Sequence, residues 1–231
     1  GKSLVDFNRA GIPLMELVTE PVIHDALTAG RFARELQLLL RTLEASDANL
    51  EKGEMRIEAN ISVSTQEGTF GTKVEVKNIN SFRSVERAIA FEIDRQIALI
   101  ESGGKVVQET RGWDETKQVT FHQRFKEGSA DYRYFPEPDL PKLFLSEIPE
   151  LSPENLRATL PELPWDKRNR LRKEYGLKEE VVELFMQDSK LGTFFETVVS
   201  GRMPDFARLA ANYITTDLTA LLKEKVQNVF P

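Results

Sequence analysis

Residues 54–63, with the sequence EMRIEANISV, alternate strictly between polar and apolar side chains. A period of two predicts a β-strand that turns one face toward a core and the other away from it. The outward face would carry a guanidinium, a carboxylate, an amide and a hydroxyl, from Arg56, Glu58, Asn60 and Ser62. These groups can hold metal ions and anions, so this strand is the first candidate for chemistry.

A second alternating segment, GTKVEVKN, follows after a hairpin-sized linker, and Lys73, Glu75 and Lys77 share one of its faces. An antiparallel hairpin would bring Glu58 and Glu75 onto one surface beside these lysines. Carboxylates ligate hard cations and lysines balance phosphate oxygens, so the pattern suits magnesium held together with a polyphosphate. On the residues alone, a solvent-facing sheet of cross-strand ion pairs is the simpler interpretation.

An apolar run upstream, GIPLMELVTEP, encloses Glu16 and ends near Glu20. We expect this run to be a buried strand. Because glutamate is rarely buried without a partner, both residues are candidate metal ligands. A salt bridge to one of the many arginines explains them equally well.

Two segments could contact nucleic acid. In DYRYFP, Arg133 lies among aromatic residues that could stack on a base, although a packed connector is the simpler interpretation. Residues 166–178, DKRNRLRKEYGLK, hold six cations and two acids. This local excess could bind RNA phosphates, although an ordinary solvated helix has the same composition. The candidate cations of this segment are Lys167, Arg168, Arg170 and Arg172.

The composition excludes several other kinds of site. The 231 residues include 31 Lys and Arg, 37 Asp and Glu and no Cys, for a formal net charge of −6. Without cysteine there is no disulfide, no thiolate metal site and no cysteine nucleophile. The phosphate-loop spacing GxxxxGK[ST] and the dinucleotide fingerprint GxGxxG are both absent. No apolar run is long enough to cross a membrane, so we expect a soluble intracellular protein.

The elements that would position these residues fall into two parts. Helical periodicity over residues 24–43 and 84–102 accompanies the strands, whereas helical patterns dominate after a proline-rich crossing at 136–153. We therefore expect an α+β fold, with a mixed domain over residues 1–147 and an all-helical domain over 148–231.

Five segments occur in an order and at a spacing that identify a family. They are VDFNRAGIPLMELVTEP, GEMRIEANISV, GTKVEVKNINSF, GGKVVQETRGWDE and DYRYFPEPDLP. Together they resemble the B subunits of the aspartyl/glutamyl-tRNA(Asn/Gln) amidotransferases, continuously over about residues 3–145 and more loosely beyond. The resemblance implies a cradle domain built on a mixed or antiparallel sheet, followed by a helical domain.

The resemblance also implies an activity. Members of this family use ATP and magnesium to phosphorylate the side-chain carboxylate of mischarged Glu-tRNA(Gln) or Asp-tRNA(Asn). Ammonia from an amidase (glutaminase) partner, the A subunit, then displaces the phosphate, and a heterotrimer is completed by a small C subunit. The expected location is the cytoplasm, or alternatively the mitochondrial matrix. A non-catalytic tRNA-binding or scaffold module of the same fold is the main alternative, and a carboxylate–amine ligase that does not use tRNA is a third.

Carried onto this chain, the resemblance implies that Glu16, Glu58 and Glu75 are catalytic metal ligands. Glu58 stands where the family commonly has Asp, and Ile57 where it often has Cys; we expect the latter change to alter packing only. The implied ATP-site residues are Arg56, Asn60, Ser62, Lys73 and Lys77, and the implied tRNA contacts are Arg133 and the cations of residues 166–178.

Two parts of the family pattern are missing from this sequence, namely an N-terminal strand with further ligands and a C-terminal tail module. We therefore expect the chain to be a fragment, with an incomplete metal site and little activity alone.

Overall fold

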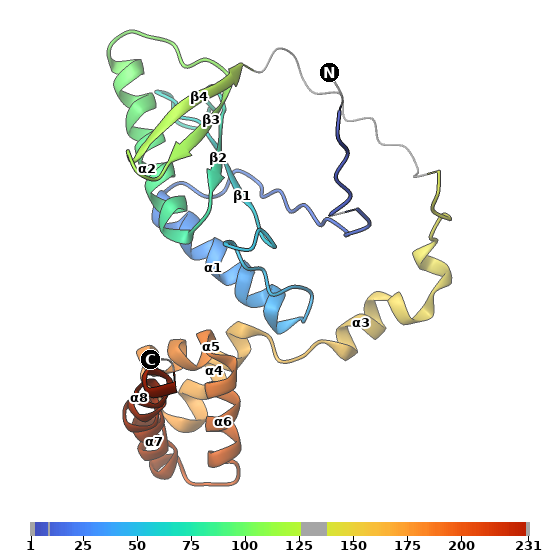
Figure 1. Cartoon of the computed structure of the whole chain (residues 1–231), viewed down its shortest axis with the longest axis vertical. Helices are drawn as coiled ribbons and strands as arrows, with labels where there is room; N and C mark the ends of the chain where they lie inside the picture. Colours follow the sequence, from blue (N-terminus) through green and yellow to red (C-terminus); the bar gives the residue numbers. More distant parts are fainter. Residues whose placement is uncertain (1–2, 9, 126–137, 230–231) are drawn as a thin grey trace.

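A four-stranded mixed sheet lies at the centre of the first part of the chain (Figure 1). The computed structural model describes residues 3–8, 10–125 and 138–229. In spatial order, β1 (Ile57–Ile61) pairs antiparallel with β2 (Val74–Ile79), which pairs parallel with β3 (Glu109–Asp114); β4 (Val119–Phe125) is antiparallel to β3. The antiparallel hairpin predicted for the first two strands is confirmed.

Two helices accompany the sheet. The parallel pair of β2 and β3 needs a crossover, which is provided by α2 (Phe82–Glu101), and α1 (Ala26–Thr42) packs against α2. Each helix begins at a side-chain cap: the Asp25 carboxylate accepts from the Thr28 amide, and the Ser81 hydroxyl accepts from the Ser84 amide. The core between α2 and the sheet is apolar along β1 and β2, and it consists of Ile61, Val76, Ile79, Val85, Ala88, Ile89 and Trp113.

The second part of the chain is helical. Short turns precede it at η1 (Leu145–Glu147) and η2 (Pro149–Leu151). The helices are α3 (Pro153–Thr159), α4 (Pro164–Tyr175), α5 (Glu179–Gln187), α6 (Ser189–Val199), α7 (Pro204–Tyr213), the π-helical η3 (Ile214–Leu218) and α8 (Thr219–Val229). Phe185 and Phe195 stack in its core with ring centroids 4.6 Å apart, and Tyr175 packs edge-on against Phe195. Gly176 ends α4 in the left-handed conformation, as its position in the sequence predicts.

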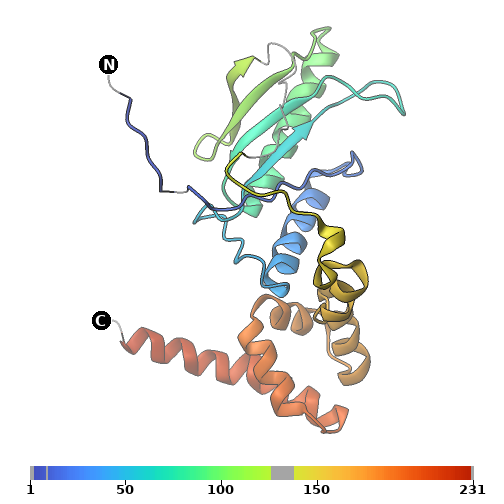
Figure 2. The same cartoon turned by 90° about the vertical axis from the view of Figure 1, so that its right-hand side faces the viewer.

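Helix α1 connects the two parts. Figure 1 shows it between the sheet and the helical bundle, and Leu38 of α1 packs against the helical core. The Arg168 guanidinium of α4 donates to Glu35 of α1 over 2.7 Å. Figure 2 shows α8 running outward from the bundle. Among the helices that the structure describes, none has the length and apolar character needed to cross a lipid bilayer.

The α+β class is confirmed, whereas two local predictions are wrong. The first strand spans five residues instead of ten, because β2 supplies ladder partners only from Ile57 to Ile61. The run around Glu16 is neither a strand nor buried: Leu14 is 89% exposed and Val18 is 78% exposed. No strand pairs with this run within the described residues, so its backbone has no ladder.

Candidate functional site

The face of the sheet opposite α2 holds one lysine between two glutamates. Lys77 Nζ donates to both carboxylate oxygens of Glu58, each at 2.9 Å, and lies 3.7 Å from Oε2 of Glu75. Glu58 comes from β1 and the other two residues from β2, so the predicted hairpin brings them together. The side chain of Glu75 is only 13% exposed, whereas that of Glu58 is 44% exposed. We call Glu58, Lys77 and Glu75 the carboxylate–lysine site.

The electrostatics of this site keep Lys77 charged. Partial burial on its own would lower the pKa of Lys77, and the nearby Arg124 acts in the same direction. The hydrogen bonds to Glu58 and the negative charges of Glu58 and Glu75 outweigh both, so the pKa of Lys77 is raised. The site therefore stabilises a positive charge between two carboxylates.

A bulge in β2 lies directly beside Lys77. Ile57 pairs with Ile79 but Ala59 pairs with Val76, so β2 contains one residue more than β1 over this stretch. The backbone of β2 leaves the extended conformation at Asn78, whose φ is +62°. This is the left-handed region, which Asn tolerates better than most residues. Bulges re-aim neighbouring side chains and are common next to functional sites.

Thr110 is a member of the site that pattern analysis missed. It pairs in parallel register with Glu75, is 1% exposed, and its hydroxyl donates to Glu75 Oε2 over 3.0 Å. The segment QETRGW identifies the family but does not indicate which strand β3 joins. Parallel pairing through a crossover leaves no local sequence signal, so this contact could be found only from the structure.

The remaining candidate ATP-site residues lie around the carboxylate–lysine site. Asn60 is exposed on β1 and pairs with Glu75. Arg56, Ser62 and Lys73 are also exposed, but they lie just beyond the strand ends. The alternation of the two faces is thus confirmed, while the roles of these four residues remain predictions.

Ile57 lies on the opposite, apolar face and packs against the sheet core. The expected consequence of its replacing Cys, a change in packing, agrees with this location.

Glu16 does not join the other two glutamates. It is exposed in the segment before α1, and within the described part of the chain it forms no ion pair. Among the residues that the structure describes, no group of three or more histidine or carboxylate side chains is placed to hold a metal ion. The geometric expectation of three glutamates around one ion is therefore not met.

The pair Glu58 and Glu75 offers the kind of ligand that magnesium uses in proteins. Mg²⁺ is usually bound by one or two carboxylates, with water and substrate phosphates as its other ligands. In the structure the Lys77 ammonium lies between the two carboxylates, 2.9 Å from Glu58 and 3.7 Å from Glu75.

The four candidate RNA-binding cations of α4 are engaged in ion pairs within the chain. Lys167 and Arg170 both pair with Glu196 of α6, and Arg168 pairs with Glu35 and Glu183. Arg172 is more exposed, and its nearest carboxylate is 3.9 Å away on Glu179. Their role in tRNA binding stays a prediction. Arg133 lies outside the described residues.

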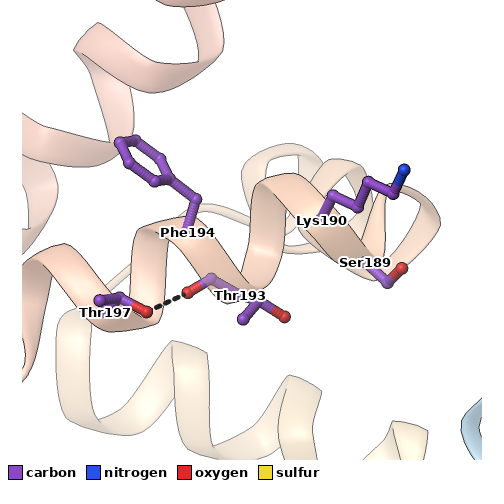
Figure 3. Close-up of a pocket in the computed structure, with 5 residues that line it drawn as sticks. All are labelled: Ser189, Lys190, Thr193, Phe194 and Thr197. Atoms are coloured by element: carbon purple, nitrogen blue, oxygen red, sulfur yellow. Dashed lines mark hydrogen bonds between the residues drawn. The ribbon is translucent and has the colours of Figure 1, made fainter.

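Two surface hollows lie elsewhere on the molecule. One of about 410 Å³ lies along α6, where Figure 3 shows Phe194, Lys190 and Thr197 on its walls. The Thr197 hydroxyl donates to the backbone carbonyl of Thr193 within the same helix. A second hollow, of about 330 Å³, is lined partly by Ile100 and Gly104 at the end of α2. Neither is lined by a residue of the carboxylate–lysine site.

The family model and the similar proteins that match this chain all point to the same family. The family model described as the GatB/GatE catalytic domain matches residues 1–148. Two proteins named as B subunits of an aspartyl/glutamyl-tRNA(Asn/Gln) amidotransferase are 47% identical over 225 residues in Nostoc punctiforme and 48% identical over 228 residues in Thermosynechococcus vestitus. A third protein of the same name, from Thermomicrobium roseum, is 48% identical over 224 residues.

Each of these matches covers 96% of this chain, but only 45%, 44% and 46% of the respective relatives. The chain therefore spans a little under half the length of the relatives it matches. The family model covers the sheet and the carboxylate–lysine site together, and it extends over well over half of the chain. The chain belongs to the GatB/GatE catalytic domain family.

Proposed function

We propose that this chain carries the carboxylate-activating part of a tRNA-dependent amidotransferase. In this proposal the complete protein uses ATP and Mg²⁺ to phosphorylate the side-chain carboxylate of Glu-tRNA(Gln) or Asp-tRNA(Asn). Ammonia then attacks the acyl carbon and releases phosphate. The relatives are named as B subunits of an amidotransferase, which supports a complex with other subunits. In this proposal those subunits are a glutaminase and a small third subunit. Their bacterial sources support a cytoplasmic location.

The observation that carries the proposal is the carboxylate–lysine site itself. Both carboxylates and the lysine lie on one sheet face, within the residues that the family model matches. The side chain of Glu75 is only 13% exposed, and it accepts a hydrogen bond from Thr110 besides its ion pair with Lys77, an arrangement that a sheet of surface ion pairs does not require. The function therefore rests on this arrangement more than on net charge or composition.

The side chains of the site have separable roles. Carboxylate attack on ATP brings anions together, so positive charge must be present before the reactants meet. Lys77 provides that charge at a fixed place, and the exposed Lys73 and Arg56 add to it from the strand ends. Asn60 is exposed and pairs with Glu75, which supports a role for its amide in orienting the acceptor carboxylate.

Magnesium would be held by Glu58 and Glu75 and would supply charge neutralisation for the phosphates. Thr110 restrains the Glu75 carboxylate through its hydrogen bond, so less reorganisation is needed when a cation binds. Glu16 lies outside this arrangement, in the exposed segment before α1, and its role as a ligand stays a prediction.

The test uses the full-length protein assembled with its partners, mischarged Glu-tRNA(Gln) and ATP, with ADP formation as the measurement. We expect Glu75→Gln to lower tRNA-dependent ADP formation by about 100-fold or more, because it removes charge from the site of phosphoryl transfer. The matched control is Glu67→Gln, an equally isosteric change in the exposed β1–β2 linker of the same hairpin. It should leave the rate unchanged.

Intact ADP formation by Glu75→Gln would overturn the assignment of this site. If the wild-type assembly binds the tRNA but forms no ADP in response to it, the chain is a tRNA-binding or scaffold module instead. ADP formation with a free amino acid in place of the tRNA would point to a general carboxylate–amine ligase.

A further inference from the structure

Strand β3 connects the carboxylate–lysine site to a second group of polar residues on the other side of the sheet. Thr110 faces the site and donates to Glu75. Its neighbours Glu109 and Arg111 face α2, where Nη1 of Arg111 donates to Glu109 over 2.7 Å. Thr110 and Arg111 are adjacent in the strand, and their side chains point to opposite faces. Contacts that hold Arg111 in place therefore also restrict the position of Thr110.

The group beneath the sheet is buried and densely hydrogen-bonded. Glu92 of α2 is fully buried and accepts from Thr120 of β4 at 2.9 Å and from Arg95 at 2.9 and 2.6 Å. Arg111 donates from Nε to the Thr120 hydroxyl and from Nη2 to the Thr120 carbonyl, each at 2.8 Å. Two guanidinium groups balance Glu92 and Glu109. Loss of one partner would leave a buried charge uncompensated, so the group holds a defined geometry.

The ladder between β3 and β4 is irregular at the step from Thr110 to Arg111. Thr110 pairs with Arg124 whereas Arg111 pairs with His122, so β4 contains one extra residue at this step. At a bulge one residue is left unpaired, so the hydrogen bonds of the ladder restrain the backbone less at that point. The two donations from Arg111 to Thr120 tie β3 to β4 next to this bulge.

We propose that Arg111 is a positioning residue for the carboxylate–lysine site. Held by Thr120 and Glu92 on one side of the sheet, it fixes the place of Thr110, and the Thr110 hydroxyl in turn orients the Glu75 carboxylate on the other side. The inference deepens the proposed function, and only its consequence for catalysis rests on that function.

The experiment reads the environment of Glu75 directly, without ATP or tRNA. The side-chain carboxyl carbons of glutamate are labelled with ¹³C in the 231-residue chain, and the Glu75 signal is assigned with Glu75→Gln. Thr110→Val defines the shift that follows loss of its hydrogen bond. We expect Arg111→Lys to move the Glu75 signal in the same direction, because lysine keeps the charge but cannot make the two donations to Thr120 together.

The matched control is Arg95→Lys. Arg95 bonds the same buried Glu92 but lies on α2 and does not tie β3 to β4; its ion pair with Glu109 of β3 spans 3.9 Å. This variant should lose thermal stability yet leave the Glu75 signal in place. A Glu75 signal that moves equally in Arg95→Lys would show a general structural effect and overturn the proposal.

If Arg111→Lys does not fold, a second pair of variants decides. Thr120→Val removes the acceptor for Arg111 Nε and the donor to Glu92, whereas Thr120→Ser keeps both. We expect the valine variant to move the Glu75 signal and the serine variant to restore it. A folded Arg111→Lys or Thr120→Val protein with an unmoved Glu75 signal would refute the inference. Absence of ATP turnover in the assembled enzyme would refute the proposed function without touching this result.

Discussion

Arg168 links the two parts of the chain, and its removal is the perturbation with the clearest structural consequence. Its guanidinium donates to Glu35 of α1 at 2.7 Å and to the two carboxylate oxygens of Glu183 of α5 at 2.6 and 3.2 Å. Both carboxylates raise the pKa of Arg168, the bond to Glu35 most of all, despite opposing desolvation. We expect Arg168→Met to break this junction while keeping the aliphatic packing of the side chain.

The magnitude follows from the exposure of the partners. Hydrogen bonds to charged groups contribute about 1.5–3 kcal/mol when shielded, but exposed ion pairs contribute only about 0.2–1 kcal/mol. The Arg168 side chain is 17% exposed and those of Glu35 and Glu183 are 39% and 36% exposed, so water partly replaces the lost contacts. We therefore expect a loss of about 1–2 kcal/mol, which lowers the melting temperature by about 2–8 °C in a chain of this size.

Two measurements together test this prediction. Urea denaturation gives the loss of stability. Because the chain has no cysteine, spin labels at Glu101→Cys and Ser189→Cys report the distance between the sheet part and the helical part. We expect Arg168→Met to broaden that distance distribution. Arg172→Met serves as the control, since Arg172 is 41% exposed and its nearest carboxylate lies at 3.9 Å.

An unchanged distance distribution and denaturation midpoint in Arg168→Met would refute the role of Arg168 as the junction. A variant that keeps both properties but loses affinity for tRNA would instead support the RNA-binding role predicted from the sequence.

Two further predictions concern stability. Phe195→Ala should destabilise the chain by about 3–5 kcal/mol in urea denaturation, because Phe195 is fully buried and stacks on Phe185; a loss below about 1 kcal/mol would contradict this packing. Burial on its own would raise the pKa of Glu109, but hydrogen bonds from Arg111 and His122 outweigh it and lower that pKa below its ordinary value. A carboxylate with a depressed pKa stabilises the folded state above its unfolded pKa, and this stability is lost as the pH falls through its folded pKa. Denaturation measured from neutral pH down through the acidic range should therefore show a smaller acid-induced loss for Glu109→Gln than for the wild type, and an equal loss would contradict this role of Glu109.

Local pattern predicted the parts of the site that lie close in sequence. Alternating polarity placed Glu58 opposite the apolar face, and a hairpin-length linker paired it with the strand of Glu75 and Lys77. These inferences succeeded because side-chain direction in a strand is a property of the backbone itself.

The predictions that failed depend on long-range partners. An apolar run such as that around Glu16 becomes a buried strand only if another strand pairs with it, and none does among the described residues. The contact of Thr110 with Glu75 could not be predicted, because the parallel pairing of β2 and β3 depends on how the crossover helix packs and leaves no local sequence signal. The role of the α4 cations in binding tRNA stays a prediction; the carboxylates that pair with them, on α1, α5 and α6, lie outside any local window of the sequence.

In the proposed function, the sheet face that carries the carboxylate–lysine site activates a carboxylate with ATP. This activation is tested most directly with Glu-tRNA(Gln) carrying ¹⁸O in the glutamate side-chain carboxylate, added to the complete assembly with ATP and glutamine. If the carboxylate attacks the γ-phosphorus and ammonia later displaces the phosphate, the released inorganic phosphate must carry one ¹⁸O atom. We predict that mass spectrometry finds it, and that Glu75→Gln forms this labelled phosphate about 100-fold more slowly. Amidated tRNA formed together with unlabelled phosphate would contradict the proposed function.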